Sequence, residues 1–241
     1  MPTKEAEILY PRALAVLEDL RKLEDDLAMA GKTVSGELII GASTIPGAYI
    51  LPVIASSFKS RYPGISFEIR IEDSARIVES LLANELFIGI VGAKIPARKI
   101  TYEPFVEDEL ILVCAGDNPL PQKIAAEYLT ELPFIFRESG SGTRKNIETF
   151  LAQKHIGADQ LNIVAILGSS TAVKEAVKAD LGVSIISRYA LQDELVSGSV
   201  REIAIHGMSM SRMLYIASAS KRTLPHHYQV FLNSIVQSRL E

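Results

Sequence analysis

The sequence predicts an α/β protein built from two lobes and preceded by a long separate helix. Strand-like and helix-like segments alternate from residue 36 onwards, which is typical of parallel strands with helices on both faces. Two successive strand-like runs at 100–106 and 110–115 interrupt this alternation, which then resumes, so two α/β units are expected. Residues 4–30 follow a different, purely helical pattern.

The helical segment carries a narrow apolar stripe. Its members step by four and three residues alternately, as in the seam of a coiled coil. They are Leu9, Ala13, Val16, Leu20, Leu23, Leu27 and Ala30. Because a lone helix of this kind is marginal in water, we expect residues 1–34 to form a linker and dimerisation helix that ends at Gly31. The alternative is an ordinary surface helix that lies on its own domain.

The first α/β unit follows this helix. Short apolar runs bounded by turn residues favour buried strands, and apolar residues at helical spacing favour amphipathic helices. We expect strands at 37–41, 65–71 and 87–91 and helices at 50–62 and 75–83. The strands at 100–106 and 110–115 are expected to be separate, with Glu107-Asp108-Glu109 between them.

The second unit repeats the alternation. We expect helices near 125–129, 145–154, 171–179 and 189–195, strands at 134–136, 162–166, 183–186, 200–205 and 212–219, and a closing helix at 226–240. If the chain crosses near 114–115 and returns near 217–218, the closing helix completes the first unit. Lobe I is then 35–114 with 219–241, and lobe II is 115–218. A double-crossover hinge would join the lobes around a ligand cleft.

Composition restricts the class of protein. Of the 241 residues 48% are hydrophobic and 22% charged, as in an ordinary globular protein. The net charge of −4 argues against nucleic-acid binding by this chain alone. The single cysteine, Cys114, lies in an apolar run and is expected to be a small buried residue. No secretion signal or membrane-length apolar run is visible, so we expect a cytoplasmic protein.

Residues 137–144 read Arg-Glu-Ser-Gly-Ser-Gly-Thr-Arg and lie where an apolar strand gives way to a helix. Free backbone N–H groups and the positive end of a helix dipole favour anions at such a junction. The alternative is that the hydroxyls only cap the helix. A dinucleotide fingerprint would need a third glycine at Lys145, and the glycine spacing of a phosphate loop is absent.

Several motifs together resemble the LysR-type transcriptional regulators. They are a leader with Thr3, Ala6 and Leu9, the heptad helix, GELIIGAST at 36–44, Leu51-Pro52 followed by Phe58 and Tyr62-Pro63, EDELILV at 107–113 with Asn118-Pro119, RESGSGTR at 137–144, and VKADLGVSII at 177–186. The resemblance covers residues 3–240. It implies two Rossmann-like lobes similar to type 2 periplasmic binding proteins, with a small effector in the cleft.

The family's N-terminal winged helix-turn-helix domain has no counterpart here. We favour a chain cut at the linker helix over a regulator that naturally lacks the domain, and we expect no operator binding by this chain alone. In the family, effector closure changes how dimers associate into tetramers, so the expected partners are a second copy, a small effector, and DNA through the missing domain only.

The resemblance also implies effector contacts at four places, and each of them lies at the end of an apolar strand, where open α/β sheets bind ligands. The predicted effector-binding residues are Ser43, Thr44, Ser74, Ser139, Gly140, Ser141, Gly142, Thr143, Ser169, Ser170 and Thr171. Ser43 and Thr44 have an alternative role as helix caps next to Pro46. Arg144, inside the first helical turn, is expected to point outward.

The sequence therefore predicts an effector-sensing domain that binds a small anionic metabolite and requires no metal or other cofactor. The alternative is a stand-alone solute receptor of a transporter, but a receptor requires export and usually works as a monomer. Catalysis is not expected. The histidines are His155, His206, His226 and His227, and they show neither metal-ligand spacing with Cys114 nor a nucleophile-elbow pattern.

Overall fold

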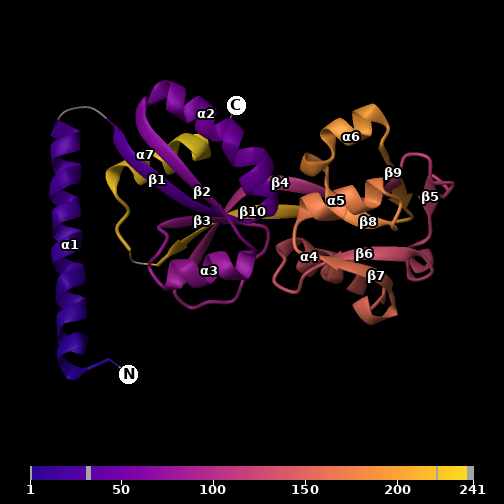
Figure 1. Cartoon of the computed structure of the whole chain (residues 1–241), viewed down its shortest axis with the longest axis horizontal. Helices are drawn as coiled ribbons and strands as arrows, with labels where there is room; N and C mark the ends of the chain where they lie inside the picture. The colour runs from indigo at the N-terminus through magenta and orange to yellow at the C-terminus, as the bar shows by residue number, and fades with distance from the viewer. Residues whose placement is uncertain (1, 31–33, 221, 238–241) are drawn as a thin grey trace. The chain divides into compact units, whose positions relative to one another are not determined.

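The computed structural model describes residues 2–30, 34–220 and 222–237 (Figure 1). Helices and strands alternate along most of this part of the chain. The elements are α1 (Lys4–Ala30), β1 (Ser35–Ala42), η1 (Pro46–Ile50), α2 (Leu51–Arg61), β2 (Gly64–Ile71), α3 (Ser74–Leu82), β3 (Ile88–Val91), β4 (Ile100–Ala115), β5 (Lys123–Ile124), η2 (Ala126–Thr130), β6 (Pro133–Arg137), α4 (Gly142–Ala152), η3 (Ala158–Gln160), β7 (Asn162–Leu167), α5 (Ser170–Lys178), β8 (Ser184–Ser187), η4 (Arg188–Ala190), α6 (Gln192–Ser197), β9 (Val200–Ile205), β10 (Met210–Ala219) and α7 (His226–Gln237).

The predicted α/β fold with a long N-terminal helix is confirmed. Some details were wrong. The strands expected at 100–106 and 110–115 are one continuous strand, β4. The acidic residues between them do not form a loop, because each pairs with a residue of β10. Asp108 lies opposite Arg212. Their side chains form an ion pair, which offsets the free-energy cost of removing the Asp108 carboxylate from water. The helix expected near 125–129 is a 3₁₀ turn, η2, and the helix expected near 189–195 is a 3₁₀ turn, η4, followed by α6.

β4 and β10 are long strands that pair with each other in the middle of the main sheet. Strand order in the main sheet is β2-β1-β3-β10-β4-β9-β5, with β8 also paired to β4. β4 pairs with β10 from Ile100 to Leu110 and with β8 and β9 from Leu110 to Ala115. The other edge of β10 pairs with β3, which lies parallel to β1. β6 and β7 form a separate parallel pair.

The chain divides into two compact units. The first comprises residues 1–38, 54–68 and 221–241, and the second comprises 39–53 and 69–220. In the first unit Phe58, Phe67 and Phe231 pack edge to face, with ring centroids 5.2–6.0 Å apart. The two pockets described below are lined only by residues of the second unit. The division into lobes at 114–115 and 218–219 stays a prediction.

The apolar stripe of α1 is exposed within this chain. Leu9, Val16, Leu20 and Leu23 expose 55–67% of their surface, although α1 belongs to the first compact unit. The side chain of Leu27, together with Gly31, falls outside the described residues. In the described part of the chain, no helix is both long and apolar enough to cross a membrane.

Helix α3 packs unusually close to β1 and β3, which places its N-terminus beside the ends of these strands. A Cβ atom at Gly41 would come within 2.5 Å of Leu86 Cδ1 and 2.9 Å of Ile77 Cδ1, and one at Gly89 would clash with Ile77 Cγ2. Ile77 is 1% exposed, so it has little room to move. Glycine is therefore required on both strands for this approach.

We predict that Gly89→Ala lowers the free energy of unfolding by about 1–3 kcal/mol, because the added methyl group overpacks the contact with α3. Urea denaturation measures the change. The matched control is Gly168→Ala, where a Cβ meets nothing within 4 Å, and we expect a change within about 0.5 kcal/mol there. Equal effects at the two positions would contradict this account of α3 packing.

Candidate functional site

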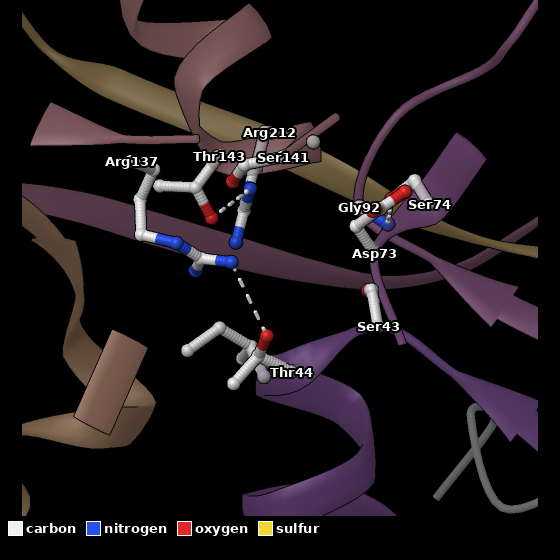
Figure 2. Close-up of a pocket in the computed structure, with 11 residues that line it drawn as sticks. Ser43, Thr44, Asp73, Ser74, Gly92, Arg137, Ser141, Thr143 and Arg212 are labelled. Atoms are coloured by element: carbon white, nitrogen blue, oxygen red, sulfur yellow. Dashed lines mark hydrogen bonds between the residues drawn. The ribbon is translucent and has the colours of Figure 1, made fainter. Parts of the chain in front are cut away.

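Two adjoining pockets lie at the strand ends of the second compact unit. The inner pocket has an empty volume of about 230 Å³, open solvent at its mouth included. Figure 2 shows its lining, which consists of Ser43, Thr44, Ile45, Asp73, Ser74, Gly92, Arg137, Ser141, Gly142, Thr143 and Arg212. The outer pocket has an empty volume of about 510 Å³ and is lined by Thr44, Ile71, Glu72, Asp73, Glu138, Gly168 and Ser169. The two share Thr44 and Asp73.

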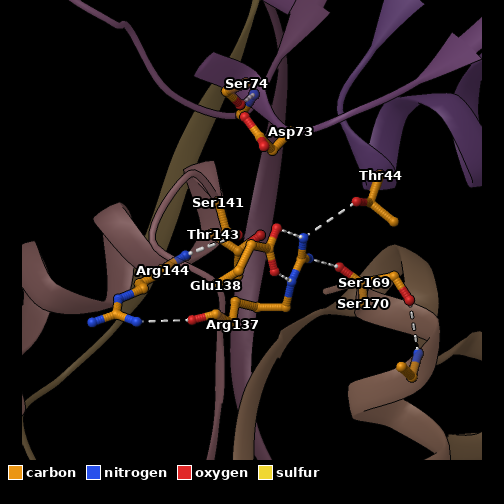
Figure 3. A network of polar contacts seen from close by, with 12 residues as sticks. Thr44, Asp73, Ser74, Arg137, Glu138, Ser141, Thr143, Arg144, Ser169 and Ser170 are labelled. Carbon is orange, nitrogen blue, oxygen red and sulfur yellow. Dashed lines mark hydrogen bonds and ion pairs between the residues drawn. The ribbon is translucent and has the colours of Figure 1, made fainter. Parts of the chain in front are cut away.

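Arg137, the last residue of β6, is 5% exposed and links three segments of the chain. Its Nε and Nη2 atoms donate to the two carboxylate oxygens of Glu138 at 2.7 and 2.6 Å. Nη1 donates to Ser170 Oγ at 2.7 Å, and Nη2 donates to Thr44 Oγ1 at 3.4 Å. Figure 3 shows the guanidinium in the middle of this network. The bidentate geometry to Glu138 fixes the plane of the group.

Arg212 supplies a second buried guanidinium from β10. Its Nε and Nη2 atoms lie 2.8 and 2.7 Å from Asp108 Oδ2, and Nη1 donates to Thr143 Oγ1 at 3.0 Å. Asp108 in turn accepts from Ser187 Oγ at 2.6 Å. Burial lowers the pKa of Arg212, the charge and hydrogen bond of Asp108 oppose this, and the charge of Arg137 lowers it further. The two guanidiniums thus lie near enough to repel each other.

The hydroxyl groups held by these arginines can donate to a ligand. Thr44 and Thr143 each accept a hydrogen bond from an arginine. Because a hydroxyl that accepts a hydrogen bond keeps its own proton, both side chains can still donate through their O–H groups. Both line the inner pocket. Buried backbone at the start of α4 adds the positive end of a helix dipole. This lining is therefore rich in hydrogen-bond donors, which suits ligands that carry anionic oxygens.

Some predicted site residues have the structural role of helix caps. Ser141 Oγ accepts from Arg144 N at 3.3 Å at the start of α4, and Ser169 Oγ accepts from Ala172 N at 3.1 Å at the start of α5. The capping alternative thus applies to these two serines, although Ser141 also lines the inner pocket. Ser43 lies at the start of the helical run that begins at residue 44, where its backbone carbonyl accepts from Gly47 N at 2.9 Å, but among the described residues neither Ser43 nor Thr44 forms a side-chain capping bond.

The remaining predicted residues differ in position. Ser43 and Ser74 line the inner pocket, where Ser74 Oγ accepts from Gly92 N at 3.3 Å. Ser170 is buried and contacts Arg137 instead of lining either pocket. Ser139 and Thr171 are exposed and line neither pocket. Effector contact remains a prediction for every residue of the set.

Gly142 and Gly140 are needed for close packing at the site. A Cβ atom at Gly142 would lie 2.7 Å from Ser74 Oγ, and one at Gly140 would lie 2.8 Å from a carboxylate oxygen of Asp73. Asn146 Nδ2 also donates to Gly92 O at 2.8 Å. The N-termini of α3 and α4 therefore lie close together, and both contribute to the lining of the inner pocket.

Sequence reasoning missed Arg212, Asp108 and Asp73. A signal for Arg212 was present, because alternation along β10 places it on the same buried face as Met210 and Leu214. A charged residue on a buried strand face requires a partner. Arg144 lines neither pocket: it pairs with Glu148 at 2.8 Å and donates to Arg137 O. Within the described residues, no group of three or more His, Cys, Asp or Glu side chains is placed to hold a metal ion.

Fold and site together define an α/β ligand-binding domain with a donor-rich pocket at its strand ends. The profile of one family, described as the LysR substrate binding domain, matches residues 31–239. The chain therefore belongs to that family, as the motifs of the sequence had indicated.

Two transcriptional regulators and one solved regulatory domain are similar to this chain. The HTH-type transcriptional regulator YeiE of Escherichia coli K12 is 31% identical over 231 residues, which are 95% of this chain and 76% of that protein. A probable RuBisCO transcriptional regulator of Cyanidioschyzon merolae is 33% identical over 90% of this chain and 71% of its own. The regulatory domain of Synechocystis PCC6803 CcmR, solved in complex with 2-PG, matches with a TM-score of 0.76 and 26% identity. The match covers 85% of this chain and 97% of that one.

We predict that Asp108→Asn lowers the free energy of unfolding by about 3–5 kcal/mol, because it leaves the buried Arg212 charge without its counter-ion. Urea denaturation followed by circular dichroism measures this. Glu175→Gln is the matched control, since it removes an exposed carboxylate that pairs with Lys178 at 3.0 Å, and its effect should stay below about 1 kcal/mol. A mild effect at Asp108 would show that the buried pair does not stabilise the fold.

Proposed function

We propose that this effector-binding domain of a LysR-type regulator senses a small anion in the inner pocket. The observation that carries the proposal is the pair of buried guanidiniums, Arg137 and Arg212, which hold the hydroxyls of Thr44 and Thr143 at the pocket wall. A carboxylate or phosphate would accept from these hydroxyls and complement the start of α4. The complex of CcmR with 2-PG supports an anion, since that relative binds one.

The pocket draws on both predicted lobes. Ser43, Thr44 and Asp73 belong to the predicted lobe I, and Arg137 and Thr143 belong to the predicted lobe II. Binding at their junction would favour a closed arrangement. We propose that closure alters how copies of the chain associate, and that the regulator reaches DNA through a domain outside this sequence. No catalytic step is proposed. The family match and relatives such as YeiE, which is named as a transcriptional regulator, favour this function over a transporter receptor.

The proposed anion site is tested by placing a negative charge in it. Ser141→Asp keeps a good helix cap while it adds a carboxylate to the pocket lining. We expect isothermal titration with a panel of carboxylates, phosphate and sulfate to identify a binding anion, and the variant to lose about tenfold or more in affinity through like-charge repulsion.

The matched control is Ser57→Asp, which adds the same charge at an exposed position of α2 outside both pockets. Its affinity should remain within about twofold, as expected for a screened surface charge. Equal losses in both variants, or unchanged affinity in Ser141→Asp, would place the anion elsewhere.

We further propose that α1 mediates homodimerisation through its exposed stripe. Leu9, Val16 and Leu23 lie seven residues apart, the period of a coiled-coil seam, and each exposes more than half of its surface. Replacing all three with Lys should weaken self-association about tenfold or more in sedimentation equilibrium, since charges cannot be buried in the seam. Glu7→Lys, at an exposed polar position of the same helix, should leave association unchanged. An unaffected triple variant would assign the dimer contact to other surfaces.

A further inference from the structure

We propose that the effector carries a hydrogen-bond donor, a hydroxyl or an ammonium, next to its anionic group, and that Asp73 accepts from that donor. This inference rests on the anion site proposed above and adds to it the class of ligand. It follows from the position of Asp73, from its unused oxygen and from the balance of charge around the two pockets.

Asp73 lies where the two pockets join. It lines both of them, as does Thr44, so a ligand that reaches from the inner pocket outward passes between these two side chains. Figure 3 shows Asp73 and Thr44 extending from neighbouring segments above the Arg137 network. A donor group a few bonds from the anionic group of the ligand would therefore face the Asp73 carboxylate.

One oxygen of Asp73 is already used. Asp73 caps α3, and Oδ1 accepts from the backbone N–H groups of Ala75 and Arg76, both at 2.9 Å. Among the described residues no hydrogen bond to Oδ2 is formed. Because a carboxylate oxygen accepts more than one hydrogen bond, Oδ2 is available to a donor on the ligand.

Capping does not explain why this residue is charged. Asn and Ser cap helices about as well as Asp, so the charge of Asp73 is not needed for α3. Arg212 is neutralised by Asp108 and Arg137 by Glu138, whereas Asp73 has no Lys or Arg ion-pair partner in the described part of the chain. The outer pocket adds Glu72 and Glu138, and no Lys or Arg is found in its described lining.

The consequence is a site that discriminates between acids. A purely anionic ligand gains the hydroxyl and helix-dipole donors of the inner pocket but meets the negative charge of Asp73. A ligand with a hydroxyl or ammonium beside its acid group turns this repulsion into a charge-assisted hydrogen bond. Asp73 is then a specificity-determining residue that selects hydroxy acids or amino acids over plain acids.

The test uses two series of acids that differ only at carbon 2: propionate, lactate and alanine, and succinate, malate and aspartate. Isothermal titration compares the wild-type chain with Asp73→Asn, which keeps the helix cap. In the wild type, we expect the hydroxy or amino member of one series to bind about tenfold or more tightly than the plain acid, the range for a hydrogen bond to a charged group.

In Asp73→Asn this preference should fall to about twofold or less for an ammonium, because the ion pair is lost. For a hydroxyl the preference should fall only partly, because the Asn side-chain oxygen still accepts a hydrogen bond. The size of the fall therefore distinguishes a hydroxyl donor from an ammonium donor. The plain acid should bind the variant more tightly than the wild type. Asp73→Ser provides a second capped variant with the same expected loss of preference.

Glu79→Gln is the matched control, since it removes an exposed carboxylate of α3 that lines neither of the two pockets, and it should leave the ratio within about twofold. Equal binding of the plain acid and its derivatives by the wild type, or an unchanged ratio in both Asp73 variants, would overturn this proposal while the anion site stands. Failure of every acid, phosphate and sulfate to bind would refute the anion site and this proposal together.

Discussion

Two buried guanidinium groups require partners, and this requirement organises the site. An arginine cannot lose its proton in the protein interior, so each buried Arg must be matched by acceptors or the fold is strongly destabilised. Arg212 obtains them from Asp108 on the neighbouring strand and from Thr143. Arg137 obtains them from Glu138, Ser170 and Thr44. These hydrogen bonds and ion pairs bring segments that are far apart in sequence together around the inner pocket.

This arrangement would let a set of uncharged hydroxyls bind the proposed effector. The arginines orient the hydroxyls and leave their protons free to donate, while the internal carboxylates prevent an excess of positive charge. A ligand need not supply a counter-ion for the fold to be stable. It needs oxygens that accept from the wall and, if Asp73 acts as proposed, a donor that faces outward.

The order of helices and strands was largely predictable from the sequence, because apolar periodicity and turn residues act locally. The continuity of β4 was not, since Glu107, Asp108 and Glu109 look like a loop until Arg212 is known to lie opposite, more than a hundred residues later. The site was predictable only in part. Helix starts marked Ser43, Thr44 and Thr143, but which neighbouring hydroxyl faces the pocket depends on the register of the turn, and Ser139 and Ser141 face differently.

The most direct test of the central claim is a crystal structure of the chain with the tightest-binding acid of the titration. The account predicts electron density for the acid group in the inner pocket, with its oxygens within hydrogen-bond distance of Thr44 Oγ1 and Thr143 Oγ1. Density for the acid group at another surface, with the inner pocket filled by water alone, would contradict it.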